Sequence, residues 1–310
     1  MAETINSGKA AFTATLGGLC AILLWSFTIA FTRSISEHLG PVYGAGYVYL
    51  ISAVFGLINV LRSSKQRSKL TNLPHRYLWG CGSLFVGYML CLFFAVGMAE
   101  NRSQSLEIGL INYLWPALIL VFSVPILKNK ASWLLLPGTA LALFGVFLVL
   151  TGGGGHTWHT IINNLSANPM ASLLALFAAL SWGLYSNLTR KWVGPDQAGG
   201  AVPFFLAATA VALFAMHFFV DEPRNWSLQV AGEVAALAFV TLTAYSLWDN
   251  AMRKGNTIFL AASSYMTPLL STIVSCIYLS VAPTPSLWIG CGLLIFGSLL
   301  SWISVTKGRD

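Results

Sequence analysis

Ten apolar segments account for most of this chain of 310 residues. Each is close to the roughly 20 residues that a helix needs to cross a bilayer. Because only helices and closed barrels satisfy their backbone polar groups inside lipid, segments of this length predict an all-α integral membrane protein with ten transmembrane helices. The segments cover residues 12–32, 41–61, 77–98, 104–127, 133–151, 171–190, 201–220, 230–252, 257–281 and 286–305.

The composition agrees with a chain that lies mainly in lipid. Of the residues, 56% are hydrophobic and 9% are charged, whereas soluble domains carry about 25% charged residues. Almost nothing is left for a soluble domain. The five cysteines all fall inside apolar segments and their number is odd, which indicates small core residues and no disulfide framework. They are Cys20, Cys81, Cys91, Cys276 and Cys291.

The basic residues predict the orientation of the helices. If the N-terminus is cytoplasmic, only Arg33, Arg102 and Arg224 of the 17 basic residues fall on the outer side. The positive-inside rule therefore places both termini in the cytoplasm of a bacterial-type inner membrane. Because the net charge of +7 follows this topology, the bilayer is the expected partner and a nucleic acid is not. The oligomeric state stays open.

The chain also reads as two related halves, 1–155 and 156–310, joined by a glycine-rich linker at about 151–170. Several residues recur about 152 to 157 positions later. Because each half holds an odd number of helices, the second copy must enter the membrane from the opposite side, which predicts two inverted five-helix repeats around a central cavity. The recurring pairs are Trp25 and Trp182, Arg33 and Arg190, Tyr88 and Tyr245, Tyr113 and Tyr265, Pro116 and Pro268, Gly138 and Gly290, Phe144 and Phe296, and Gly145 and Gly297.

Two prolines lie near the middle of their segments, Pro116 in Ile-Asn-Tyr-Leu-Trp-Pro (residues 111–116) and Pro268 in Ser-Tyr-Met-Thr-Pro (residues 264–268). Proline removes a backbone donor and clashes with the carbonyl four residues earlier, so the helix must bend. Two interrupted helices in corresponding places indicate a transport site between repeats. We therefore predict that both prolines act as hinges in alternating access.

The chain resembles the EamA branch of the drug/metabolite transporter superfamily. The resemblance rests on the five-plus-five layout and the spans from Ala99 to Pro116 and from Ala251 to Pro268. The stretch 245–256 and residues 111–116 resemble more closely the aromatic amino acid exporters of the YddG type. This resemblance implies secondary or facilitated export of aromatic and other apolar amino acids from the cytoplasm.

A pocket for such a substrate should be mostly apolar and aromatic, with a few polar groups that fix its orientation. Aromatic and polar residues at helical spacings in several segments fit this description. Arg33 and Arg190 are candidate gating residues. The candidate substrate-binding residues are Trp25, Tyr88, Asn112, Tyr113, Trp115, Trp182, Tyr185, Tyr245, Trp248, Asp249 and Tyr265.

Each of these residues also has a purely structural interpretation. Tryptophans are common at membrane interfaces, Asn112 could bond a neighbouring helix, and Asp249 could form an ion pair with Arg253, four residues later. Both gating candidates could extend their charges to the interface. The belt tryptophans are assigned as Trp133, Trp226, Trp288 and Trp302, and Gly138, Gly145, Gly290 and Gly297 are assigned to close helix contact.

Other chemistry is not supported by the sequence. His156 and His159 lie in the linker without a third ligand, so neither a metal nor a cofactor is expected. No soluble domain is present to hydrolyse ATP. An exporter of another metabolite or drug on the same fold stays an alternative. A membrane-embedded enzyme is disfavoured, because it would need clustered His, Asp or Glu at one depth.

Overall fold

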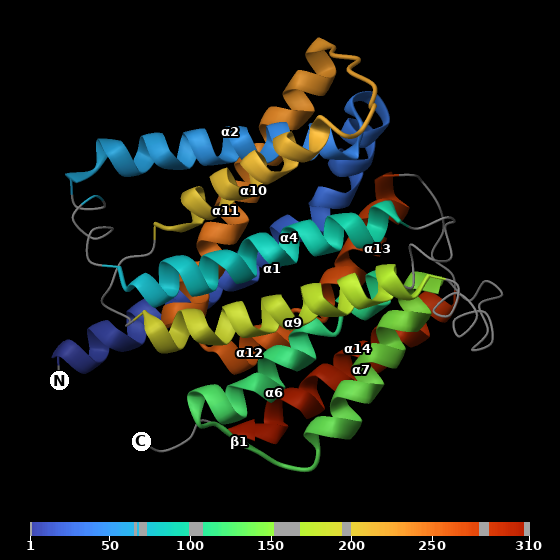
Figure 1. The fold of residues 1–310 in the computed structure, drawn as a ribbon. Helices are drawn as coiled ribbons and strands as arrows, with labels where there is room; N and C mark the ends of the chain where they lie inside the picture. The colour runs from blue at the N-terminus through green and yellow to red at the C-terminus, as the bar shows by residue number, and fades with distance from the viewer. Residues whose placement is uncertain are drawn as a thin grey trace. The chain divides into compact units, whose positions relative to one another are not determined.

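The computed structural model describes residues 2–64, 67, 73–98, 108–151, 168–193, 200–278 and 285–306, which are mainly helical (Figure 1). Two-residue strands β1 (Lys130–Ala131) and β2 (Val305–Thr306) pair antiparallel. The helical elements are α1 (Ala2–Leu39), α2 (Pro41–Arg62), η1 (Arg76–Cys81), α4 (Gly82–Gly97), α6 (Trp115–Leu127), α7 (Leu135–Thr151), α9 (Pro169–Trp192), α10 (Val202–His217), α11 (Leu228–Lys254), α12 (Thr257–Ser263), α13 (Met266–Tyr278) and α14 (Pro285–Ser304).

Among the residues that the structure describes, six stretches of helix are long and apolar enough to cross a membrane, and this confirms the predicted helical membrane protein. Three further apolar helices are shorter, at Leu135–Val149, Val202–Met216 and Trp288–Ser304. The remaining predicted segment, 257–281, corresponds to α12 and α13. The six longer stretches are Gly8–Ser26, Pro41–Arg62, Arg76–Gly97, Ile108–Leu127, Pro169–Trp192 and Leu228–Lys254.

The chain divides into two compact units. Unit 1 comprises Met1–Val86 and Thr189–Asn256, and unit 2 comprises Gly87–Leu188 and Thr257–Asp310. Each unit draws on both halves of the sequence. The units are therefore a different division from the halves 1–155 and 156–310, which stay a prediction.

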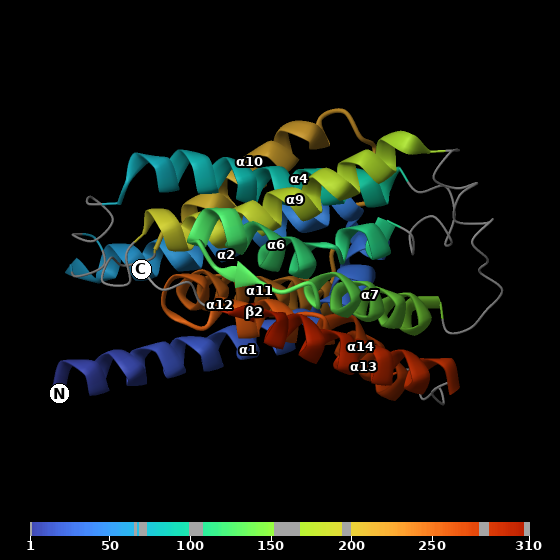
Figure 2. The same cartoon turned by 90° about the horizontal axis from the view of Figure 1, so that it is seen from below.

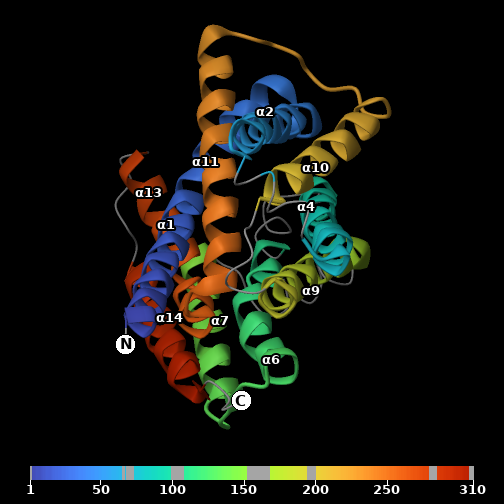
Figure 3. The same cartoon turned by 90° about the vertical axis from the view of Figure 1, so that its left-hand side faces the viewer.

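In unit 1, α1 packs along α11 and α2 packs along α10 (Figure 3). Apolar side chains of α1, α2 and α11, such as Ile35, Val48 and Val234, form a common core. The hydroxyl of Ser52 donates a hydrogen bond of 2.8 Å to the Ala238 carbonyl and so joins α2 to α11. Small and apolar residues at helical spacing thus hold the helices of this unit close together.

The N-terminus of α2 is capped from a distant part of the chain. The Glu222 carboxylate accepts hydrogen bonds from the backbone N–H groups of Val42 (2.9 Å) and Tyr43 (2.8 Å). Its negative charge also complements the positive end of the helix dipole. Gly40 precedes the helix with φ of 79°, and a Cβ there would lie within 3 Å of the Glu222 side chain. Glycine therefore makes room for the cap.

In unit 2, α7 and α14 lie side by side and antiparallel (Figure 2). A Cβ on Gly145 would collide with the Gly290 carbonyl, and a Cβ on Gly297 with the Gly138 carbonyl. The backbones therefore touch at both glycine pairs, as small residues allow in membrane helices. This confirms the close-contact interpretation of the four glycines.

The apolar core beside these helices contains residues from both halves of the sequence. Tyr265, Leu269 and Leu294 are buried in it, together with Ala117 and Ala142. Ala117 and Leu269 are 152 positions apart, and so are Ala142 and Leu294. Residues separated by the predicted repeat offset of 152 positions thus share one core.

The helices that contain the two prolines are interrupted at equivalent places. The helix at 108–112 ends in a turn at Tyr113 and Leu114 before α6 begins, and a turn at Ser264 and Tyr265 separates α12 from α13. The backbone N–H of Leu114 bonds the carbonyl three residues back at 3.1 Å, and that of Tyr265 does the same at 3.3 Å. The predicted bends are therefore present, while the hinge motion stays a prediction.

The glycine contact can be tested by a pair of matched substitutions in α14. We expect Gly297→Ala to destabilise the protein by about 1–3 kcal/mol, because its new methyl group overlaps α7. Gly292→Ala has open space around its Cβ position and should leave stability unchanged. Thermal unfolding in detergent measures both, and equal unfolding midpoints for the two variants would contradict the packing described for α7 and α14.

Candidate functional site

The predicted aromatic residues of unit 2 gather around Trp182 on α9. Its ring lies 4.7 Å from that of Tyr88 and 5.0 Å from that of Tyr185, measured between centroids. Trp115 at the start of α6 approaches edge-on at 6.4 Å. We call Tyr88, Trp115, Trp182 and Tyr185 the Trp182 cluster. Such offset and edge-on contacts are the geometry in which aromatic rings attract one another.

Asn112 adds a polar group to the Trp182 cluster. It lies at the end of the helix at 108–112, three residues before Trp115, and is only 9% exposed. Its side chain lies near that of Tyr88 on α4. The Oδ1 atom of Asn112 has no hydrogen-bond partner among the residues that the structure describes. A buried acceptor left in this state is costly, so it is a candidate for contact with a substrate donor.

A close contact between α6 and α9 fixes the cluster in place. Asn187 on α9 donates hydrogen bonds from its side-chain amide to the carbonyls of Ile119 (3.0 Å) and Gly183 (2.9 Å). Gly183 lies against Leu118 on α6, where a Cβ would be within 3 Å. The sequence analysis did not identify Asn187. Its position five residues after Trp182, inside an apolar segment, is the signal that marks it.

Two of the predicted binding residues lie in the apolar core of unit 2. Tyr265 is fully buried there, and Tyr113 packs against the same core. The structure thus places both tyrosines beside the helix interruptions and close to the glycine-paired helices. They pack in the core that supports the two breaks, and a contact with substrate stays a prediction for them.

The predicted residues of unit 1 form a second aromatic group. The Trp25 ring on α1 lies 5.4 Å from that of Tyr245 and 5.2 Å from that of Trp248, both on α11. Phe85, which the sequence analysis did not single out, contacts Tyr245 at 5.2 Å. Trp248 is fully buried. These contacts join α1, α4 and α11 within the unit.

Asp249 takes part in a buried polar network one residue further along α11. Its Oδ2 atom pairs with Nε of Arg253 at 2.9 Å, and both side chains are at most 4% exposed. Its Oδ1 atom accepts a hydrogen bond of 2.7 Å from the Tyr77 hydroxyl. The structure therefore shows the ion pair that the spacing allows. Contact between Asp249 and a substrate ammonium group stays a prediction.

Tyr77 reaches Asp249 from a π-helical turn, η1. Such turns are rare and often occur at functional positions. Tyr77 is fully buried, whereas Trp79, two residues later, is 78% exposed. The turn thus directs one aromatic side chain into the unit and another out of it. Tyr77 was missed because its partner Asp249 is 172 residues away.

The two gating candidates differ in what the structure shows. Arg190 is part-buried and donates hydrogen bonds from Nη1 to the carbonyls of Gly255 (2.7 Å) and Met252 (3.3 Å) at the end of α11. It therefore caps that helix with a positive charge, as the helix dipole favours. Arg33 belongs to α1, but its side chain lies outside the described residues. Gating stays a prediction for both.

The described residues hold no cluster of three or more His, Cys, Asp or Glu side chains that could bind a metal ion. His156 and His159 lie outside the described residues. Among the described parts of the chain, the chemistry available is thus aromatic surface, the Asn112 amide and the Asp249 network. This set suits non-covalent binding of a small molecule.

Comparison with known proteins identifies the family. The EamA-like transporter family matches residues 12–151 and again residues 169–303. The chain belongs to the EamA-like transporter family. It is accordingly a membrane transporter and not an enzyme, and the resemblance found in the sequence is confirmed.

Two named relatives and one solved structure resemble this EamA-family chain over almost its whole length. The aromatic amino acid exporter YddG of Escherichia coli K12 is 35% identical over 296 residues, which cover 95% of this chain and 98% of that protein. The exporter of the same name from Salmonella typhimurium is 35% identical over 295 residues, with the same coverage. A protein of known crystal structure superposes with a TM-score of 0.77 at 27% identity, covering 93% of this chain and 97% of the other.

The buried ion pair of this EamA-family transporter can be tested by a double-substitution cycle. We expect Arg253→Met alone to cost about 3–5 kcal/mol of stability, because it leaves the Asp249 carboxylate buried and uncompensated. Adding Asp249→Leu should recover most of the loss, since an apolar pair of similar size can replace a buried ion pair. Lys254→Met, on the next residue of α11, serves as the control.

Thermal unfolding of the purified variants measures this cycle. A double variant that is no more stable than Arg253→Met alone would show that the two charges are not coupled as described.

Proposed function

We propose that this protein exports aromatic and other apolar amino acids across the bacterial inner membrane by alternating access. The names of its relatives from Escherichia coli and Salmonella typhimurium support this substrate class. The observation in this chain that carries the proposal is the Trp182 cluster with Asn112 beside it. An aromatic amino acid has an apolar ring and an ammonium group, which match these two features.

The cluster supplies complementary surfaces for both parts of such a substrate. Aromatic rings attract one another edge-on or offset, and they also attract a cation over their faces. The Oδ1 atom of Asn112 can accept a hydrogen bond from an ammonium group, and a bond to a charged group contributes about 1.5–3 kcal/mol. Because the cluster is largely buried, binding there requires the protein to open toward one side of the membrane at a time.

The proposal includes ten membrane-spanning helices in two inverted repeats around a central cavity. The family matches the chain twice, at 12–151 and 169–303, which is the expected trace of a duplication. The contacts between α7 and α14 support it further. Gly290 lies 152 positions after Gly138, and Gly145 lies 152 positions before Gly297. The proposed repeat therefore exchanges the contact between Gly138 and Gly297 with the contact between Gly290 and Gly145.

The helix interruptions at Tyr113 and Tyr265 are the proposed hinges. Each tyrosine precedes a proline by three residues, and the backbone N–H groups of Leu114 and Tyr265 bond the third residue back instead of the fourth. A helix that has already lost regular backbone bonds bends at little further cost, as in other transporters with discontinuous helices. Arg33 and Arg190 are the proposed gating residues, since they occupy equivalent places in the two repeats.

The proposed location is the inner membrane with both termini in the cytoplasm. Helical proteins of this kind differ from the β-barrels of the bacterial outer membrane. The distribution of 14 of the 17 basic residues on one side of the predicted topology supports the orientation. Transport is proposed to be secondary or facilitated.

Transport in proteoliposomes tests the substrate class directly. We expect saturable movement of radiolabelled phenylalanine, with competition by unlabelled tryptophan and methionine but not by lysine. The physical reason is that the aromatic cluster gains from an apolar side chain and offers nothing for a second cation. Saturable movement of a cationic drug alone, with no movement of phenylalanine, would overturn the amino acid proposal in favour of a drug exporter of the same fold.

Two substitutions test the cluster itself. Asn112→Leu should raise the KM for phenylalanine about tenfold or more, because the hydrogen bond to the ammonium group is lost and each factor of ten corresponds to about 1.4 kcal/mol. Trp182→Leu should act in the same direction through lost ring contact. Trp133→Leu is the matched control, since that ring is 78% exposed.

All three variants are compared at equal folded yield, judged by size-exclusion profile and thermal unfolding. A KM for Asn112→Leu equal to that of Trp133→Leu would place the substrate elsewhere.

A further inference from the structure

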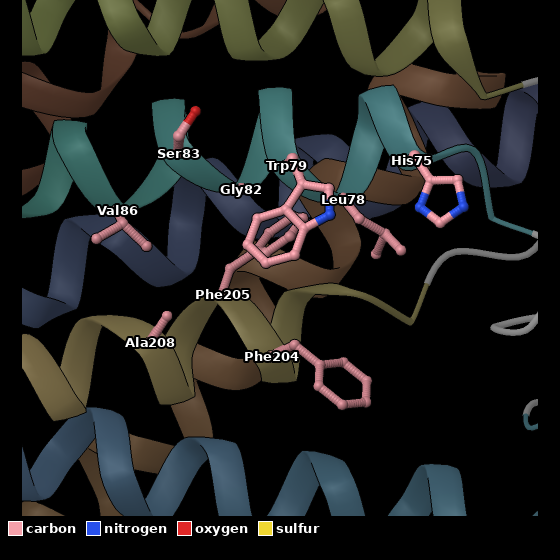
Figure 4. A pocket seen from close by; sticks show the side chains of 9 residues that line it. All are labelled: His75, Leu78, Trp79, Gly82, Ser83, Val86, Phe204, Phe205 and Ala208. Atoms are coloured by element: carbon pink, nitrogen blue, oxygen red, sulfur yellow. The ribbon is translucent and has the colours of Figure 1, made fainter.

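A groove outside the Trp182 cluster runs between the η1–α4 helix and α10 in unit 1 (Figure 4). Its volume is about 690 Å³. Trp79 reaches from η1 toward α10, and Phe205 rises from α10 to form part of the groove wall. The nine lining residues are His75, Leu78, Trp79, Gly82, Ser83, Val86, Phe204, Phe205 and Ala208.

Small residues hollow out this groove. Gly82 lies against the Phe205 ring, where a Cβ would approach within 3 Å, and Ser83 and Ala208 add little bulk. The part of the wall formed by Phe205 is firmly held. The Phe205 ring contacts Tyr77 at 5.7 Å and Phe85 at 5.6 Å, so it rests on the buried interior of the unit.

The lining suits a hydrocarbon and not an amino acid. Only His75 and Ser83 bring polar side chains, and the other lining residues are apolar. A zwitterion held here would leave its charged groups without partners, which is costly in an apolar site. Phe204, on the rim, is 44% exposed and Trp79 is 78% exposed, so the groove opens to the outside of these helices.

The length of the groove matches one lipid chain. From His75 to Val86 there are eleven helical steps, or about 16 Å at about 1.5 Å per residue. The hydrocarbon core of a bilayer is about 30 Å thick, so one leaflet contributes about 15 Å. A single acyl chain of one leaflet therefore spans the groove from end to end.

The end of the groove at His75 is positively charged. Arg76 is exposed next to His75, and the preceding stretch 62–76 contains five lysine and arginine residues. Basic residues immediately beside a membrane helix attract anionic lipid headgroups. An acyl chain that enters the groove from this end places its phosphate beside Arg76.

We propose that this groove binds one acyl chain of an anionic phospholipid, with its headgroup beside Arg76. The site is separate from the proposed substrate site and does not depend on which substrate is exported. The bound lipid belongs to the leaflet at the basic end of the groove, which is the cytoplasmic leaflet in the predicted topology. It lies against the η1 turn that contains Tyr77.

Native mass spectrometry of the purified protein tests the proposal with phosphatidylglycerol and phosphatidylcholine of identical chains. We expect the first phosphatidylglycerol to bind at least fivefold more tightly than the first phosphatidylcholine. Ala208→Phe, which fills the groove from an exposed position, should abolish this preference. Val211→Phe is the control, because it adds the same ring on α10, is 69% exposed and does not line the groove.

A second groove-filling variant, Ser83→Leu on α4, should reproduce the loss if Ala208→Phe reduces the folded yield. Arg76→Gln should lower the preference for phosphatidylglycerol while leaving phosphatidylcholine binding unchanged. Three results would overturn the proposal: equal lipid binding by Ala208→Phe and Val211→Phe, equal affinity for the two lipids in the unmodified protein, or displacement of the bound lipid by phenylalanine.

Discussion

Inside a bilayer every backbone N–H and C=O must find a partner within the protein, and this chain interrupts its helices with a short turn just before α6 and again just before α13. Each turn has a hydrogen bond to the third residue back, and a proline follows within the first three residues of the next helix. The fold tolerates these helix interruptions because they lie against a buried core that contains residues from both halves of the sequence. The glycine-paired helices α7 and α14 pack beside that core without room for a methyl group. Each helix interruption therefore lies next to a tightly packed core.

The polar groups of the structure divide into those with assigned partners and a few buried atoms that have none in the described part of the chain. Asp249 has Arg253 and Tyr77 as partners, and Glu222 caps α2, so both carboxylates act mainly in holding helices together. Asn112 Oδ1 belongs to the second group, as do Asn187 Oδ1, Glu233 Oε2, Tyr265 OH and Thr267 Oγ1. What distinguishes the Asn112 oxygen is its place beside the Trp182 cluster, where a substrate donor is proposed to reach it.

Features that depend on local spacing could be predicted from the sequence. The apolar segments, the bends at Pro116 and Pro268 and the four glycine contacts follow from periodicity, backbone chemistry and size, and the structure shows them. The possible ion pair of Asp249 with Arg253 followed from their four-residue spacing. Spacing could not predict which side chains that are distant in the sequence contact one another. Hydropathy indicates the depth of a residue but not its neighbours, so it did not predict that Tyr113 and Tyr265, which were grouped with the pocket, pack against an apolar core. The partners Tyr77 and Glu222 were missed for the same reason.

The central claim is that a carrier with one aromatic site opens alternately to the two sides of the membrane. Counterflow in proteoliposomes tests it most directly, because a carrier exchanges substrate faster than it returns empty. With phenylalanine loaded inside, the account predicts that radiolabelled phenylalanine enters several times faster than it enters empty vesicles, and that the Asn112→Leu variant loses this acceleration at the same concentration. Uptake that is unaffected by the internal phenylalanine, and that rises linearly with external concentration, would contradict alternating access and indicate a channel.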